Sequence, residues 1–372
     1  MSGTTIWDIA GLCVASAAIT GLICYHASSI GRAIQVMDKP DGARKLHQKE
    51  TPLIGGPAIL VPALAISFLS YVTLSFAPIM FVALVATLAA FIIGLIDDRI
   101  ALSPTLRVGL LTAVIVAVLF IDPLFILHTL AFRIFGVTFS VALPNFFAAP
   151  FVVLMILGFV NAANMADGMN GQLLGSVMLW SVFTVRYMGL DAGLPYIAVI
   201  CSTLVAFAFN LRGRLFTGSS GAYATSLLVA FGAIAAYRTA NGVMAAQVPV
   251  YWFWLPVLDC VRLMAWRVLN GRSPFAADRN HFHHMLLEHM RPSRALLVYL
   301  TLLAAPGIAA MVSEEAASVT LVFCIALYSI FIVANREALR KKYLFRPFSV
   351  LRILASKFWR DASQSRVKTG PV

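Results

Sequence analysis

The chain has 372 residues, of which 60% are hydrophobic and 12% are charged, and its formal net charge at pH 7 is +12. So high an apolar fraction excludes an ordinary soluble protein and indicates an integral membrane protein. The positive charge suits anionic lipid headgroups and anionic substrates better than nucleic acid, because the basic residues are spread over connections between apolar stretches.

Eleven apolar stretches could each cross a bilayer, and they predict an all-α, polytopic membrane protein. We expect one transmembrane domain, residues 1–334, followed by a basic tail, residues 335–372. No Lys or Arg precedes the first stretch, so it is predicted to be a retained helix rather than a cleaved signal peptide. The stretches centre on residues 5–25, 55–76, 79–96, 105–121, 146–160, 172–188, 193–209, 220–237, 246–261, 295–312 and 316–334.

The distribution of Lys and Arg predicts the orientation of these spans. With the N-terminus outside, the inner connections and the helix ends beside them contain all but three of the 28 basic residues. The exceptions are Arg133, Arg186 and Arg238, and the C-terminal tail is then cytoplasmic. Every unusual polar cluster falls on the same inner side, which favours one shared site.

The first polar cluster, residues 38–60, joins a basic loop to the start of the second apolar stretch. Its paired glycines, Gly55 and Gly56, would allow another backbone to approach closely. The loop could instead be a solvated, positive-inside connection. Its basic residues are Lys39, Arg44, Lys45, His47 and Lys49.

Two adjacent carboxylates, Asp97 and Asp98, close the third apolar stretch. Neighbouring acids at a membrane boundary repel each other and are costly to desolvate, so they favour a cation or a proton as partner. The structural alternative is solvation of the helix end, or pairing with Arg99 and Arg107.

The third cluster, "NAANMADGMNG", has Asn161, Asn164 and Asp167 at intervals of three residues. On a helix these side chains would share one broad face, which favours a polar binding surface. One Asn could instead cap the end of the helix.

The fourth cluster, "FTGSSGAYATSLLVA", places a polar turn from Gly218 to Gly221 at the start of an apolar helix. Backbone N–H groups at such a helix start suit a phosphate, and Arg212 and Arg214 stand just before them. The turn itself contains no acid.

The fifth cluster contains His281, His283 and His284 beside Arg279 in a strongly basic loop. Zinc is an alternative ligand, but the positive charge and the lack of cysteine disfavour it. Arginine and histidine together suit phosphate groups better. With the acids of the other clusters, they predict phosphoryl transfer supported by a divalent metal, for which magnesium is the oxygen-loving candidate.

In this order, the five clusters resemble the polyprenyl-phosphate N-acetylhexosamine-1-phosphate transferase family, of the glycosyltransferase family 4 type. The resemblance covers residues 36–295. The His-x-His-His pattern and "DDR" are most similar to its undecaprenyl-phosphate N-acetylglucosamine-1-phosphate transferase branch. The segments that carry the resemblance are "RKLHQKETPLIGGPAI", "GLIDDRIALSPTLR", "NAANMADGMNG" and "SPFAADRNHFHH".

The resemblance implies transfer of N-acetylhexosamine-1-phosphate from a UDP-sugar to undecaprenyl phosphate, with UMP as the second product. It implies a bacterial inner-membrane protein whose cytoplasmic face initiates synthesis of a cell-envelope polysaccharide such as lipopolysaccharide. Mg²⁺, or Mn²⁺ in its place, is the implied cofactor. Direct attack by the lipid phosphate and an aspartyl intermediate both stay open, and a homodimer is one option for the oligomeric state.

The resemblance also implies roles for individual residues. Asp97, Asp98 and Asp167 are expected to be catalytic, with Asp97 as the base for the lipid phosphate. Asp98, Asp167 and Ser219 are expected at the metal. The expected substrate-binding residues are Lys45, His47, Asn161, Asn164, Asn170, Arg279, His281, His283 and His284.

The sequence departs from the family pattern at two positions. Ser219 stands where the family's Gly-Asp-x-Gly-Ser turn has a magnesium-binding Asp, and Asn170 stands where another Asp is usual. A neutral hydroxyl is a poor substitute for a carboxylate at a hard cation. One alternative is therefore a catalytically impaired relative that binds a polyprenyl lipid or acts as a regulatory scaffold. A transporter or channel is a less favoured alternative.

The C-terminal tail mixes aromatic and aliphatic residues with many positive charges. From Phe348 it could form an amphipathic helix on the inner leaflet. The alternative is an unstructured basic tail.

Overall fold

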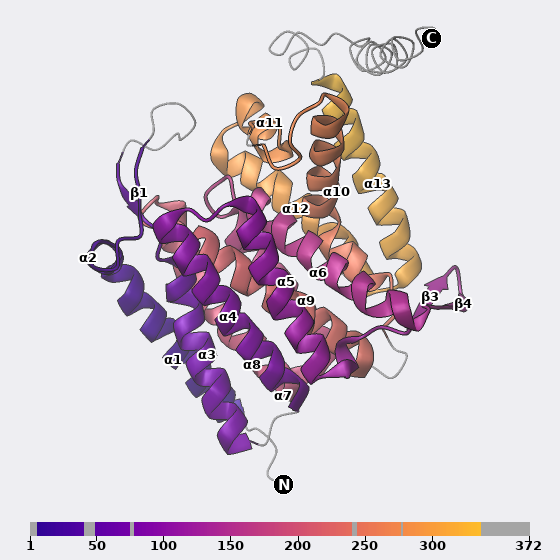
Figure 1. Ribbon diagram of the computed structural model, residues 1–372, viewed down its shortest axis with the longest axis horizontal. Helices are drawn as coiled ribbons and strands as arrows, with labels where there is room; N and C mark the ends of the chain where they lie inside the picture. Colours follow the sequence, from indigo (N-terminus) through magenta and orange to yellow (C-terminus); the bar gives the residue numbers. More distant parts are fainter. Residues whose placement is uncertain (1–5, 41–48, 75–77, 240–243, 277, 336–372) are drawn as a thin grey trace, which may run out of the picture.

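The computed structural model describes residues 6–40, 49–74, 78–239, 244–276 and 278–335, which form a bundle of long helices (Figure 1). Lys45 and His47 lie outside the described residues, as does the tail beyond Asn335. The long helices are α1 (Ile6–Tyr25), α3 (Gly55–Leu74), α4 (Pro78–Ile100), α5 (Pro104–Ile121), α6 (Asn145–Ala166), α7 (Gln172–Ala192), α8 (Leu194–Leu211), α9 (Gly218–Thr239), α10 (Val248–Leu269), α12 (Pro292–Ala310) and α13 (Glu314–Ala334). The short elements are α2 (Ala27–Ala33), β1 (Met37–Asp38), β2 (Thr51–Pro52), η1 (Pro123–Phe125), β3 (Thr129–Ile134), β4 (Val137–Ala142) and α11 (Phe282–His289).

Ten helices of the described residues are long and apolar enough to cross a membrane, so the chain is a multi-pass membrane protein. Each of the eleven predicted spans coincides with a helix. The second predicted span coincides with α3, Gly55–Leu74. Helix α10 runs eight residues beyond the predicted end at 261, which places Arg262 and Arg267 on the helix.

Helix α9 is the centre of the bundle. Every residue from Ser220 to Ala236 is buried, and the helix packs against α3, α4, α6 and α7. Small residues such as Ala222, Ala224 and Gly232 along it allow neighbouring helices to approach closely. Its 22 residues span about 33 Å at the α-helical rise, so its two ends reach opposite ends of the bundle.

Two glycines bring α3 and α4 against the start of α9. A Cβ atom at Gly94 would lie 2.4 Å from the Cα of Ser220, and one at Gly56 would lie 2.4 Å from the backbone nitrogen of Gly221. The backbone N–H groups of Gly55 and Gly56 donate to the carbonyls of Phe216 and Thr217, each at 2.9 Å. The close backbone approach predicted for the glycine pair is thus confirmed.

The fold is mostly helical, as the sequence predicts, and one exception is the β3–β4 hairpin, which lies in a stretch expected to be a connection. Thr129–Ile134 pairs with Val137–Ala142 through a two-residue turn, in which Phe135 and Gly136 both have positive φ. Aromatic and β-branched residues favour the extended conformation, and Phe132 stacks on Phe139. The second small exception is the antiparallel pair of β1 and β2.

The hairpin marks the end of the bundle opposite to β1 and α11 (Figure 1). Arg133 in β3 pairs with Glu314 at the start of α13, at 3.3 Å, and it lines one hollow with Arg186 of α7. The hydroxyl of Tyr237, next to Arg238, bonds the backbone of β3 at Ala131. The three basic residues that the charge distribution set apart therefore gather at this end.

Replacing Gly94 with Ala is expected to destabilise the protein, because the new methyl group would overlap the backbone of α9. Overpacking of this kind costs about 1–3 kcal/mol, which exceeds the gain of about 1 kcal/mol in helix propensity. Gly109→Ala in α5 is the matched control, since a Cβ there meets nothing within 4 Å. Melting temperatures in detergent should fall for Gly94→Ala only, and equal values for the two variants would contradict the packing at α9.

Candidate functional site

The carboxylate of Asp98 caps the start of α9. Its Oδ1 accepts the backbone N–H of Ser219 at 2.6 Å, and its Oδ2 accepts that of Ser220 at 3.0 Å. The first N–H groups of a helix have no partner within it and carry partial positive charge, so they hold an anion well. Gly218 has φ of +74°, and a Cβ there would lie 2.6 Å from Oδ2 of Asp98, so the turn requires glycine.

Asp97 faces a different set of donors. It accepts the backbone N–H of Leu102 at 2.9 Å, the hydroxyl of Tyr223 at 2.9 Å and the guanidinium of Arg107 at 3.4 Å. The structural alternative proposed from the sequence therefore holds for Asp97 and Arg107. It does not hold for Arg99, which bonds Gln35 at 2.9 Å. Asp97 thus ties α4 to α5 and α9.

Asp167 lies directly after α6, as the residue that follows its last helical position. The spacing predicted that Asp167 would share one helical face with Asn161 and Asn164, and this is wrong because the helix ends before Asp167. The side chain of Asp167 lies next to the hydroxyl of Thr217, just before α9, and is close enough to Asp98 for the two charges to interact. Burial and that neighbouring charge raise the pKa of Asp167 to about 7.

The polar side chains near Asp167 have different surroundings. Asn161 donates to the carbonyl of Leu157 in its own helix at 2.8 Å, and Asn164 is half-buried. Asn170 is exposed beside the turn at Gly213. Asn210, which the sequence analysis did not select, joins the two loops by accepting the N–H of Gly171 and donating to the carbonyl of Leu215.

The three predicted histidines begin α11 and close against the loop after α6. His281 is the residue before the helix, and His283, 1% exposed, packs so tightly on Gly168 that a Cβ there would lie 2.0 Å from its Nε2. Burial and the neighbouring histidines lower the pKa of His283 well below its usual value. Burial, His281 and Arg279 lower the pKa of His284 to about 4. Both imidazoles are therefore neutral near pH 7, and Arg279 is a permanent charge beside them.

The structure thus brings the described clusters together around the start of α9. Residues 55–56 bond the segment before α9, Asp98 caps it, Asp167 reaches Thr217, and His283 contacts Gly168. These contacts join segments from α3, α4, α6, α9 and α11. Acids, helix N–H groups and basic residues at one place suit a phosphorylated substrate.

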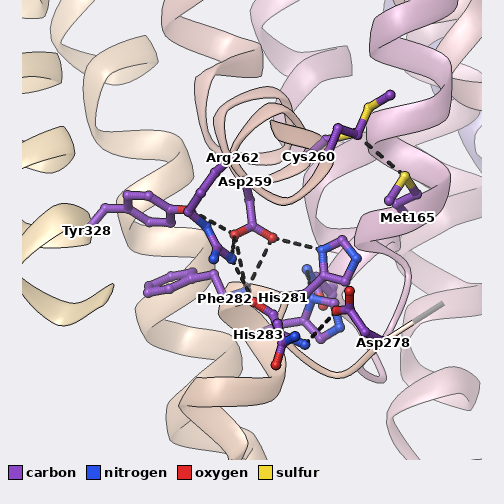
Figure 2. A network of polar contacts seen from close by, with 12 residues as sticks. Met165, Asp259, Cys260, Arg262, Asp278, His281, Phe282, His283 and Tyr328 are labelled. Carbon is purple, nitrogen blue, oxygen red and sulfur yellow. Dashed lines mark hydrogen bonds and ion pairs between the residues drawn. The ribbon is translucent and has the colours of Figure 1, made fainter. Parts of the chain in front are cut away.

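Helix α10 contributes buried charges that the sequence analysis missed (Figure 2). Asp259 accepts hydrogen bonds from His281 and Arg262, and Arg267 pairs with Asp278 at 2.8 Å. Charged residues inside the apolar run "YWFWLPVLDCVRLMAW" were the available signal, because such residues are costly in a membrane unless they are paired.

Comparisons with known proteins agree with this geometry. The model of glycosyl transferase family 4 matches residues 80–237. An undecaprenyl-phosphate alpha-N-acetylglucosaminyl 1-phosphate transferase of Escherichia coli (strain K12) is 30% identical over 301 residues, which cover 77% of this chain and 78% of that protein.

The chain belongs to glycosyl transferase family 4. It is a sugar-1-phosphate transferase embedded in a membrane by many helices. A probable undecaprenyl-phosphate N-acetylglucosaminyl 1-phosphate transferase of Bacillus subtilis (strain 168) is 29% identical over 301 residues, 76% of this chain and 77% of that protein. The family resemblance stated from the five clusters is confirmed.

The transferase offers oxygen ligands for a divalent cation beside α9. Among the described residues, no group of three or more His, Cys, Asp or Glu side chains is arranged to hold a metal. Asp98 and Asp167 nonetheless lie near enough to interact through their charges, and Thr217 lies beside Asp167. The buried hydroxyl of Ser220 lies beside the Asp98 carboxylate and makes no hydrogen bond of good geometry within the described part of the chain. This donor set fits Mg²⁺, which often takes one or two carboxylates and completes its shell with phosphates and water.

Lowering the pH from 7.5 to 5 is expected to destabilise the wild type relative to His284→Gln. The pKa of His284 is lowered to about 4 in the folded protein, against about 6.5 for an unperturbed histidine. Between these values the unfolded state binds the extra proton, so stability falls as the pH falls. Melting temperatures of both proteins in detergent at each pH test this, and a difference that does not change with pH would contradict it.

Proposed function

We propose that the transferase moves N-acetylglucosamine-1-phosphate from UDP-N-acetylglucosamine to undecaprenyl phosphate at the site where α9 begins. The observation that carries this proposal is the meeting of Asp98, Asp167 and the first turn of α9 with the histidine helix α11. The names of the relatives supply the acceptor lipid and the sugar. UDP as the carrier of the donor sugar remains part of the proposal.

In this reaction a phosphate oxygen of the acceptor attacks the phosphorus that is bonded to the sugar, and the bond from that phosphorus to UMP breaks. The products are a lipid-linked sugar diphosphate and UMP. We assign Arg107 to the acceptor phosphate, because its guanidinium is partly exposed beside Asp97. Asp97 then accepts the proton of a singly charged acceptor, after exchanging one of its three present donors. Direct attack by the acceptor phosphate needs no covalent intermediate, and a covalent aspartyl route stays open.

The donor diphosphate is assigned to the basic side of the site. Arg279 supplies fixed charge, and His284 is the least buried of the three histidines. Approach of a diphosphate would favour protonation of that imidazole and so strengthen the contact. Binding roles for His281, His283, Asn161, Asn164, Asn170, Lys45 and His47 remain predictions.

Asp98 and Asp167 are the proposed ligands of a magnesium ion, with Mn²⁺ as a substitute, and Ser219 is proposed to contribute through its hydroxyl or a water. When bound, such an ion neutralises charge on the diphosphate and orients it for displacement. Asp98 holds its position without it, because the N–H groups of Ser219 and Ser220 fix its carboxylate, and Asp167 lies nearby beside Thr217.

The biological setting is proposed from the same considerations. The site lies at the end of the bundle away from Arg133, Arg186 and Arg238, and the rule that basic residues stay inside places it in the cytoplasm. An undecaprenyl-linked product formed there suits the start of cell-envelope polysaccharide synthesis at a bacterial inner membrane. The relatives described above are named as transferases, and nothing in these comparisons supports a purely regulatory or transport role.

The direct test is transfer of label from UDP-N-acetylglucosamine to undecaprenyl phosphate by the full chain in detergent. We expect a labelled lipid product and release of UMP with Mg²⁺, and neither when the metal is chelated. Asp167→Asn should lower the rate by roughly a hundredfold or more, because it removes a carboxylate from the charge-neutralising site. Folded wild-type protein that makes no product from any UDP-N-acetylhexosamine would overturn the proposal.

Ser219→Asp is expected to lower the Mg²⁺ concentration for half-maximal rate by roughly fivefold. The new carboxylate would join Asp98 and Asp167, and affinity for a hard cation rises with the number of charged oxygen ligands. Ser219→Asn is the matched control, since it has a similar shape without the charge. Initial rates across a magnesium series measure the effect, and equal requirements for the two variants would place position 219 away from the metal.

A further inference from the structure

We infer that Asp259 of α10 is a positioning residue for the histidine motif, and that it acts on donor binding through His281. The inference deepens the proposed function and rests on it. The carboxylate lies at the centre of a network that joins α10, α11 and α13 (Figure 2). It is 6% exposed, so its hydrogen bonds come from protein groups rather than from bulk water.

The two oxygens of Asp259 have separate partners. Oδ2 bonds Nδ1 of His281 at 2.9 Å, while Oδ1 accepts the guanidinium of Arg262 at 2.7 Å and the hydroxyl of Tyr328 at 2.8 Å. The backbone N–H of Phe282 points to both oxygens, at 3.3 and 3.2 Å. Hence one carboxylate holds the imidazole of His281 and the first N–H of the helix that carries His283 and His284.

These contacts determine the chemical state of His281. A carboxylate paired with Arg262 is ionised and can only accept hydrogen bonds, so Nδ1 of His281 carries a proton. Nε2 is then the ring atom that can accept a proton or, once protonated, donate to a phosphate. Asp259 therefore selects which nitrogen of His281 is available, in the way that a carboxylate orients a histidine in other catalytic sites.

The loop before His281 is held by the same helix. Arg262 also donates to the carbonyl of Asn280 at 2.6 Å, and Arg267 pairs with Asp278, whose other oxygen accepts the N–H of Asn280 at 2.8 Å. Arg279 lies between these two anchored residues. The ring of His281 stacks on that of His283, with centroids 5.5 Å apart and an interplanar angle of 12°. The basic loop before His281 and the helix α11 are thus ordered before the substrate binds. This order lowers the entropic cost of binding.

The test is a double-mutant cycle on the full chain in detergent, read by equilibrium binding of UDP-N-acetylglucosamine and by steady-state kinetics. We expect Asp259→Asn to weaken donor binding by roughly tenfold or more, and to raise the KM for donor without raising the KM for undecaprenyl phosphate. His281→Gln should have a similar effect. The pair Asp259→Asn/His281→Gln should bind as His281→Gln does within about twofold, because residues that act as one unit are not additive.

A control variant and a second variant keep the result decisive. Tyr328→Phe removes a bond to Oδ1 and leaves that of His281 to Oδ2, so it should lower the melting temperature with much less effect on donor binding than Asp259→Asn. If Asp259→Asn does not fold, Asp259→Asn combined with Arg262→Gln removes both charges and avoids leaving one buried unpaired.

The outcomes separate the inference from the proposed function. Wild-type protein that does not bind the donor nucleotide overturns both. Wild-type binding that Asp259→Asn leaves unchanged overturns the inference alone. Multiplicative losses in the double mutant, or equal rises in both KM values, would show that Asp259 serves stability rather than His281, and would also overturn it.

Discussion

The hydrogen bonds from the first turn of α9 to Asp98 are the interaction on which the rest of the site depends. Helix α9 is the buried centre of the bundle, and its start is the point that α3, α4 and α6 all reach. Two backbone N–H groups hold a carboxylate that would otherwise be costly to bury in a membrane protein. Asp167 lies close enough to the Asp98 carboxylate held there for the two charges to interact. The glycine contacts that bring α3 and α4 against α9 therefore also place Asp98 at the start of that helix.

The two sides of the site are built by different means. The acidic side depends on helix geometry. The start of α9 holds Asp98, Arg107 and Tyr223 hold Asp97, and Asp167 lies beside Thr217. The basic side depends on buried charges in α10, which hold the loop before α11 and the first residues of that helix, while Phe282, Met285 and Leu286 pack α11 into the core. This division suits a diphosphate substrate, because a metal bound by the acids and the fixed cations of the basic side could each neutralise part of its charge.

Much of this arrangement was readable from the sequence, and the exceptions have physical reasons. Apolar length predicted the helices, and the five polar clusters predicted a common site, because membrane burial makes polar residues rare and informative. The β3–β4 hairpin was missed because the prediction relied on apolar length and on charged residues between apolar stretches, and neither signal marks a short strand. Asp259 was missed because its proposed role depends on a hydrogen bond to His281, which lies 22 residues later in the chain. The i, i+3, i+6 spacing misled at Asp167, since α6 ends one residue before it.

Asp98 and Asp167 are proposed to hold a divalent cation together beside the start of α9. Electron paramagnetic resonance of Mn²⁺ titrated into the purified protein with UDP-N-acetylglucosamine measures this without turnover. We expect a bound ion in the wild type, and roughly tenfold or greater weakening of Mn²⁺ binding in both Asp98→Asn and Asp167→Asn, with Asn161→Ala close to the wild type. Equal Mn²⁺ affinity in the wild type and in both carboxylate variants would contradict this proposal.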